Sequence, residues 1–211
     1  MPSSLLARIE SQNKYKIMVA TKSNMLPIGT TAPNFQLKDV TTGEVIEFAK
    51  QKNAKGYIIA FICNHCPFVI HLLDHLSLKF NQMPSNEIEV YAISSNDIQN
   101  YPQDSPEKMA QLATQHKFTF PYLFDGNQEV AISYRAACTP DFFLFDDQKK
   151  LFYRGQYDST RPGSKEVISG EDLLGAINNL LKGKTSPVDQ QPSIGCNIKW
   201  IPGREPEYFN A

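Results

Sequence analysis

The sequence predicts an α/β domain in which a central mixed β-sheet is flanked by helices, and three observations predict it. A continuous apolar run at 57–62 follows Gly56, which is typical of a strand buried on both faces. Pro67 then begins an amphipathic helix whose apolar side chains recur at helical spacing up to Met83. A second strand at 88–94 follows this helix, and the order strand–helix–strand fits such a sheet.

Shorter elements complete the predicted domain. The segment 40–46 predicts an N-terminal hairpin with Thr42 and Gly43 at its turn. Ser105 and Pro106 supply an N-cap and a first helical residue for a helix that extends to about His116. The remaining expected elements are a strand at 121–125, a short helix at 128–134, antiparallel strands at 141–146 and 150–154, and a last helix at 171–181.

The length of 211 residues suits one domain with terminal extensions. Residues 1–24 are polar and weakly patterned, so we expect a flexible N-terminal extension. Residues 25–184 carry the predicted elements and form the domain. Residues 185–211 contain four prolines, and we expect an irregular C-terminal tail that packs on the domain.

Charge and hydropathy exclude several function classes. The net charge is −1 and the pI is about 6.4, so we expect neither nucleic acid nor an anionic membrane surface as a partner. No run approaches the roughly 18 consecutive apolar residues of a membrane helix. The first residues lack a long apolar stretch and mix both charge signs, unlike a signal or transit peptide. We therefore expect a cytoplasmic protein.

Cysteine spacing gives the strongest functional indication. Only Cys63 and Cys66 have motif spacing, whereas Cys138 and Cys196 are isolated. Four cysteines are too few for a secreted disulfide scaffold of this length. Structural zinc sites usually need four ligands, often two such pairs, and no second pair is present. We therefore expect a redox pair that needs neither a metal nor a cofactor.

Disulfide exchange needs one thiol that ionises near neutral pH and a second thiol within reach. A helix N-terminus stabilises a thiolate, and paired cysteines there have pKa values of roughly 3.5–7.5 instead of about 8.5. Because Pro67 begins the helix, both sulfurs are expected in its first turn. We expect Cys63 to be the exposed attacking thiol and Cys66 the more buried resolving thiol.

The histidines near the pair leave alternatives open. His65 lies between the cysteines, where an imidazolium would stabilise the thiolate, although the side chain could equally face solvent. His71 and His75 have the i, i+4 spacing of a metal clasp. They fall opposite the apolar stripe of the helix, so we expect a solvated face there.

Several motifs together carry a resemblance to a known superfamily. They are Ala32-Pro33-Asn34-Phe35, the cysteine pair, Thr139-Pro140 before a strand, and Gly155 after the last hairpin. With them, residues from about 25 to 182 resemble the thioredoxin-like superfamily, and more closely its redoxin branch, which includes the AhpC/TSA peroxiredoxins. The segments 153–158 and 193–200 resemble a subgroup of thioredoxin family proteins.

The resemblance implies a thioredoxin-like fold with a redoxin-type insertion, because the separation between Cys66 and Pro140 exceeds that of minimal thioredoxins. It implies that Pro140 is cis and faces the disulfide, and that the Thr139 backbone offers strand-like hydrogen bonds to substrate. Asn64, His65 and Pro67 would support the pair. The implied activity is thiol–disulfide exchange with protein or small-molecule disulfides and thiols, and with an unidentified electron donor.

Three departures from thioredoxins bear on that activity. Ile62 stands before Cys63, where thioredoxins usually carry tryptophan. The strand at 57–62 holds no acidic residue to relay a proton. The dipeptide between the cysteines, Asn64-His65, is also unlike that of thioredoxins, so we expect a less efficient general reductase.

Two alternatives remain open. Cys66-Pro67 matches the end of the Thr-x-x-Cys-Pro motif of peroxiredoxins, which would make Cys66 a peroxidatic cysteine that reacts with peroxides. Cys63 would then stand at the threonine position, and Arg154 or Arg135 would polarise the peroxide. The other alternative is a non-catalytic binding module that kept the fold, although the complete cysteine pair argues against it.

The isolated cysteines are candidates for auxiliary thiols. Cys138 precedes Pro140 by two residues and would lie near the pair, or serve as a small buried hydrophobic residue. Cys196 could fold back as an additional resolving thiol or remain a passive one.

Overall fold

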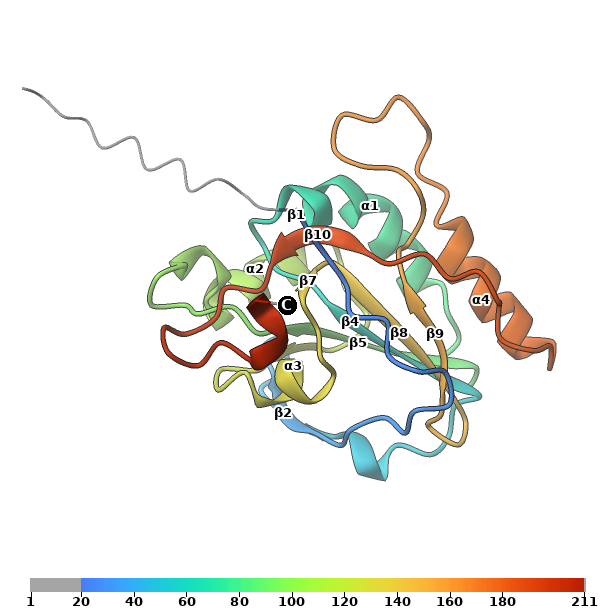
Figure 1. Cartoon of the computed structure of the whole chain (residues 1–211). Helices are drawn as coiled ribbons and strands as arrows, with labels where there is room; N and C mark the ends of the chain where they lie inside the picture. Colours follow the sequence, from blue (N-terminus) through green and yellow to red (C-terminus); the bar gives the residue numbers. More distant parts are fainter. Residues whose placement is uncertain (1–19, 211) are drawn as a thin grey trace, which may run out of the picture.

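A computed structural model, shown in Figure 1, describes residues 20–210. It contains a seven-stranded mixed sheet. The strand order is β3-β2-β6-β5-β4-β8-β9. In that sheet β4 pairs in parallel with β5, and β5 with β6, while the remaining neighbours are antiparallel. The strands are β2 (Gln36–Asp39), β3 (Val45–Glu47), β4 (Gly56–Phe61), β5 (Ile88–Ser94), β6 (Tyr122–Phe124), β8 (Asp141–Asp146) and β9 (Leu151–Gly155).

Helices cover both faces of this sheet, as the uninterrupted apolar run of β4 predicted. They are α1 (Pro67–Asn81), α2 (Pro106–Gln115), α3 (Glu129–Ser133) and α4 (Glu171–Leu181), with 3₁₀ turns η1 (Phe48–Lys50), η2 (Pro102–Asp104) and η3 (Glu207–Asn210). Ile58 and Ala60 of β4 pack with the apolar side chains of α1, α2 and α4. Ile59 and Phe61 point to the opposite face and pack with α3, η1 and the C-terminal segment. Alternation along one strand therefore supplies two cores.

The predicted N-terminal hairpin is present, with its first strand slightly earlier in the chain. Strand β2 ends at Asp39, whose carboxylate accepts hydrogen bonds from Thr41 and Thr42 and so starts the turn. Gly43 occupies this turn with a φ of 79°, a conformation that glycine adopts readily.

A second, three-stranded antiparallel sheet lies at the edge of the cysteine site. It consists of β1 (Ala20–Lys22), β10 (Ile194–Asn197) and β7 (Cys138–Thr139), in the order β1-β10-β7. In Figure 1, β10 is the red strand that runs beside β7. Of the expected flexible extension, residues 20–24 are ordered and the rest lies outside the described residues.

The tail is therefore not irregular throughout, contrary to our expectation. Strand β10 is short and gains its order from pairing across the chain, which local sequence pattern does not reveal. Its approach to β7 is so close that a Cβ added at Gly195 would lie 2.0 Å from the carbonyl oxygen of Thr139. The absent side chain of Gly195 permits this pairing.

Hydrogen bonds beyond β10 fix the tail on the domain, where we expected it to pack. The amide of Ile198 donates to the carbonyl of Ala137 at 3.1 Å. The amide of Lys199 donates to Oδ1 of Asn96 at 2.8 Å. Gln128 donates to the carbonyl of Lys199 at 2.9 Å. Within residues 20–210, no helix has the length and apolar character needed to cross a bilayer.

Replacing Gly195 with alanine should destabilise the protein, because the new methyl group would meet the backbone of Thr139. Overpacking of this kind costs about 1–3 kcal/mol of unfolding free energy. Gly175 is the matched control, since it lies exposed in α4 with no atom near its Cβ position. Gly175→Ala should stabilise by about 0.5–1 kcal/mol. Urea unfolding measures both, and equal effects of the two substitutions would contradict the close β7–β10 contact.

Candidate redox site

The cysteine pair lies where strand β4 passes into helix α1. The chain leaves the sheet after Ile62, whose amide donates to the carbonyl of Ile93 at 2.9 Å. Cys66 is the N-cap residue of α1 and Pro67 is its first residue. The amides of the first turn are therefore close to the Cys66 side chain. This is the strand-to-helix junction that the sequence predicted.

Thr139 meets both cysteines. The sulfur of Cys63 lies 3.3 Å from Oγ1 of Thr139, and the Cys66 thiol donates to the carbonyl oxygen of Thr139 at 3.0 Å. The bond between Thr139 and Pro140 is cis, as the resemblance implied. Two motifs that are far apart in the sequence thus form one site.

The exposed strand edge that the resemblance implied at Thr139 is already paired within the chain. Thr139 lies opposite Cys196 in the antiparallel pairing of β7 with β10. In this structure the C-terminal segment of the same chain therefore pairs with the backbone from which we expected hydrogen bonds to a substrate.

Cys63 is not exposed, contrary to our expectation. Its exposed fraction is 1%, and that of Cys66 is 0%. Burial raises the pKa of the Cys63 thiol well above its ordinary value, and the hydrogen bond with Cys66 and the negative charge of Asp104 raise it further. The side chain of Asn64 donates to the carbonyl of Gln103 at 3.0 Å, so the η2 segment lies against the pair.

Cys66 is the thiol whose ionised form the site favours. Its pKa is lowered from its ordinary value, first by a hydrogen bond with the thiol of Cys196 and then by one with Cys63. The amides of Cys196 and Val69 also stabilise its thiolate, while burial opposes them. Burial and then the hydrogen bond with Cys66 raise the pKa of Cys63, and the hydrogen bond with Cys66 and then burial raise the pKa of Cys196. The three sulfurs titrate as one coupled group.

Asp104 is a site residue that sequence reasoning missed. Its carboxylate is fully buried and accepts hydrogen bonds from the amide of Asn64 at 2.8 Å, from Nδ1 of His65 at 2.6 Å and from Asn96 at 2.8 Å. An acidic residue is thus present near the pair, although strand β4 supplies none. The polar run before Ser105 gave no signal that distinguished Asp104 from an ordinary loop residue.

His65 has partners on two sides. Its ring stacks on Tyr101, with centroids 5.6 Å apart, while Nδ1 donates to Asp104. Ligand atoms of Cys63, His65 and Asp104 lie within 4.8 Å of one another, which is a spacing that suits a metal ion. In this structure both Asp104 oxygens and Nδ1 of His65 are engaged in hydrogen bonds with protein groups.

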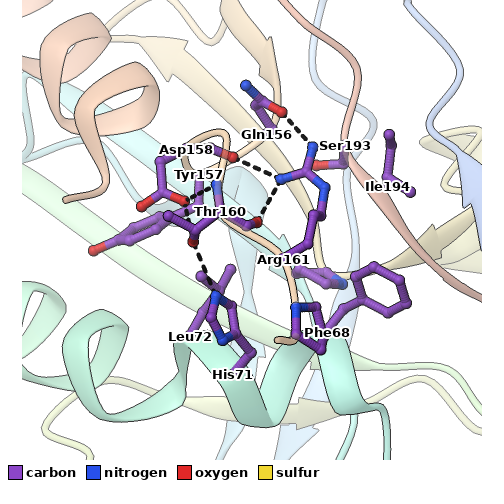
Figure 2. A pocket seen from close by; sticks show the side chains of 12 residues that line it. Phe68, His71, Leu72, Gln156, Tyr157, Asp158, Thr160, Arg161, Ser193 and Ile194 are labelled. Carbon is purple, nitrogen blue, oxygen red and sulfur yellow. Dashed lines mark hydrogen bonds between the residues drawn. The ribbon is translucent and has the colours of Figure 1, made fainter. Parts of the chain in front are cut away.

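His71 and His75 do not form the solvated face that we expected. Nε2 of His71 lies 2.9 Å from Oγ1 of Thr160, and Nδ1 of His75 lies 2.8 Å from the hydroxyl of Tyr157. The segment after β9 folds over α1 and supplies both partners. Figure 2 shows His71 hydrogen-bonded to Thr160 in a small pocket that Phe68 also lines, while the guanidinium of Arg161 is turned toward Gln156. Pro140 and Ile194 also line this pocket, so it borders the cysteine site.

The two arginines proposed for peroxide binding have partners elsewhere. Arg154 donates to Gln190 at 2.7 Å, and Arg135 lies over the ring of Tyr208 at 5.0 Å. Cys138 is fully buried, and burial raises the pKa of its thiol. This burial fits the interpretation of Cys138 as a small buried hydrophobic residue.

Comparisons with known proteins agree with this architecture. The profile of the AhpC/TSA family matches residues 28–154. An uncharacterised conserved protein from Geobacillus kaustophilus is 46% identical in sequence, with a TM-score of 0.85. The aligned region covers 88% of this chain and 98% of the Geobacillus chain. A hypothetical protein from Sinorhizobium meliloti is 42% identical, covers 87% and 100%, and has a TM-score of 0.84.

A more distant solved structure shares the fold. The thioredoxin domain of a thiol-disulfide oxidoreductase from Bacteroides vulgatus is 18% identical, covers 65% of this chain and 91% of its own, and has a TM-score of 0.52. The search of curated proteins gave no significant match. The fold is thioredoxin-like, as the sequence predicted.

Absorbance at 240 nm should detect a thiolate in the reduced protein at neutral pH, because the hydrogen bonds to Cys66 lower its pKa. The signal should disappear in Cys66→Ser. It should persist in Cys138→Ser, because burial raises the pKa of the Cys138 thiol and this thiol contributes no thiolate in the wild-type protein. As pH falls, the wild-type signal should be lost only well below the ordinary thiol pKa of about 8.5. A signal that requires Cys63 and is unaffected by Cys66→Ser would contradict this assignment.

Proposed function

Because the chain belongs to the AhpC/TSA family of redoxin-type thioredoxin-like proteins, we propose that it is a thiol–disulfide oxidoreductase that uses Cys63 and Cys66. The observation that carries the proposal is the meeting of both sulfurs with Thr139, directly before cis-Pro140. Its partners are protein or small-molecule disulfides and thiols, together with an unidentified electron donor, in the cytoplasm. No metal or cofactor enters this chemistry.

The hydrogen bond between the sulfurs gives the pair a route for its protons. A thiolate on Cys66 accepts a hydrogen bond from the Cys63 thiol. As Cys63 attacks a substrate disulfide, the substrate S–S bond breaks, the first substrate sulfur leaves as a thiolate, and the Cys63 proton passes to Cys66 along that hydrogen bond. Cys66 then attacks Cys63 in the mixed disulfide, the second substrate thiol leaves with a proton, and the Cys63–Cys66 disulfide forms.

Asp104 and His65 act on this step through charge. The carboxylate of Asp104 raises the pKa of Cys63 and so disfavours its thiolate. His65 donates a hydrogen bond to that carboxylate, and this bond reduces the effect of the negative charge on the pKa of Cys63. His65 is thus a positioning residue that offsets a nearby negative charge.

A peroxidase is the second candidate, and the lowered pKa of Cys66 favours it. Peroxide reacts with thiolates, and Cys66-Pro67 matches the peroxiredoxin motif. Attack of the Cys66 thiolate on hydrogen peroxide would break the O–O bond and give a sulfenic acid and a hydroxide ion. Cys63 would then condense with it to form the same disulfide. The contacts of Arg154 and Arg135 supply no support for this candidate.

Single-turnover reduction of oxidised glutathione tests the first candidate. Reduced wild-type protein should release two substrate thiols for each molecule as the Cys63–Cys66 disulfide forms. Cys66→Ser should stop at a mixed disulfide on Cys63, because the resolving thiol is gone. Cys63→Ser should release substrate thiols much more slowly than wild type, because the proposed attacking thiol is gone, and Cys138→Ser should behave as wild type. If Cys63→Ser still consumes one equivalent of hydrogen peroxide at the wild-type rate while wild type leaves glutathione disulfide unreduced, the peroxidase candidate replaces the first.

Opposite substitutions test the charge balance around Cys63. In a Cys66→Ser background, His65→Gln should raise the pKa of Cys63, since it leaves the Asp104 carboxylate less compensated. Asp104→Asn should lower that pKa, because it removes the charge. We expect shifts of up to about one unit, equivalent to about 1.4 kcal/mol. The pH dependence of alkylation by iodoacetamide gives the pKa values, and unchanged values in both variants would make His65 a bystander.

A further inference from the structure

Cys196 lies in the core of the cysteine site and not at its margin. It occupies the middle of β10 and is 2% exposed. It belongs to the same apolar cluster as Cys63 and Cys66, which does not include Cys138. Although it follows the pair by most of the length of the chain, the β7–β10 pairing brings it beside them.

Strand register places its side chain on the face of the pair. Residues directly opposite in antiparallel strands point to the same side of the sheet. Thr139 lies opposite Cys196, and the hydroxyl of Thr139 contacts the sulfur of Cys63 at 3.3 Å. The side chain of Cys138 therefore points to the other face, since successive residues of a strand alternate. Its own sulfur lies 3.5 Å from the carbonyl of Pro140.

Contacts with Cys66 complete the geometry. Both the thiol and the amide of Cys196 form hydrogen bonds with the Cys66 sulfur. The same sulfur lies 3.0 Å from the carbonyl oxygen of Thr139, the residue that pairs with Cys196. A disulfide between Cys66 and Cys196 requires these two sulfurs to approach to the bonded distance of about 2.05 Å.

We propose that Cys196 is a third redox-active thiol, which exchanges with the Cys63–Cys66 disulfide to form a Cys66–Cys196 disulfide. This inference rests on the proposed function, because the exchange begins from the disulfide which that function forms. It assigns the C-terminal strand a chemical part in the reaction in addition to its structural one.

The exchange conserves electrons and needs no further oxidant. Cys196 loses its proton and attacks the sulfur of Cys66. The bond between Cys63 and Cys66 breaks as the bond between Cys66 and Cys196 forms, and Cys63 leaves as a thiolate that takes up the proton. The protein remains oxidised by two electrons. Cys63 is again a free thiol, and β10 is covalently joined to the start of α1.

The anchoring of β10 determines what this bond would do. On one side, the amide of Ser193 donates to the hydroxyl of Ser23 at 2.9 Å, and on the other side Ile198 donates to Ala137 at 3.1 Å. The strand is therefore held near Cys66 before any bond forms. Because β10 covers the edge of Thr139, a Cys66–Cys196 bond would keep that edge closed to an external strand.

Disulfide mapping of the full chain tests the proposal. Reduced protein is oxidised with one equivalent of diamide, quenched with acid to prevent shuffling, alkylated, and digested for mass spectrometry. Wild type should yield both the Cys63–Cys66 and the Cys66–Cys196 peptides. Cys196→Ser should lose only the second, and Cys63→Ser should yield the second alone. Cys138→Ser, the control on the opposite face, should match wild type.

The outcomes separate this proposal from the proposed function. A Cys63–Cys66 peptide in wild type, with no Cys66–Cys196 peptide in either wild type or Cys63→Ser, would overturn the third thiol and leave the proposed function intact. Absence of the Cys63–Cys66 peptide from every protein would instead contradict the proposed function. Equal linkage of Cys66 to Cys138 would show that the sulfurs pair without regard to the β7–β10 register, and would also overturn it. Circular dichroism of each variant confirms that the fold is kept.

Discussion

A buried carboxylate must be surrounded by hydrogen-bond donors, and Asp104 imposes this requirement on the cysteine site. Its donors come from three places: the amide of Asn64, the ring of His65 and the side chain of Asn96. Asn96 also accepts from the amide of Lys199 in the C-terminal segment. One unit of negative charge thus fixes the loop between the cysteines and ties it to the tail. The same charge raises the pKa of Cys63, and so the constraint that orders the site also sets its chemistry.

Most of the fold could be predicted because its signals are local. The apolar run of β4, Pro67 at the start of α1 and the cap at Ser105 each act within a few residues. Strand β10 escaped prediction because its order depends on Gly195 meeting Thr139, which is a contact across the chain. The position of the cysteine pair could be predicted because its signals are local. The burial of Cys63 and the role of Asp104 could not be predicted, because they depend on distant parts of the chain. Exposure and buried charge depend on what the rest of the chain places around a residue.

The C-terminal segment changes how the site is understood. In the implied fold the residue before the cis-proline offers its backbone to a substrate, but here β10 already pairs with it. The site is consequently closed by its own chain, and both sulfurs of the pair are buried. A protein disulfide could reach Cys63 only if covering residues move, whereas a small disulfide or a peroxide needs less opening. The lowered pKa of Cys66 and the hydrogen bonds from Cys196 place the favoured thiolate at the centre of three sulfurs.

The central claim is that Cys63 and Cys66 form a reversible redox pair, and equilibrium with glutathione tests it most directly. The protein is incubated over a series of glutathione redox ratios, and the fraction of Cys63–Cys66 disulfide is measured after acid quenching. We predict one reversible two-electron transition, reached from both the oxidised and the reduced protein, in which a tenfold change in the equilibrium constant corresponds to about 30 mV. A protein that stays fully reduced, or forms only mixed disulfides with glutathione across the whole series, would contradict the account.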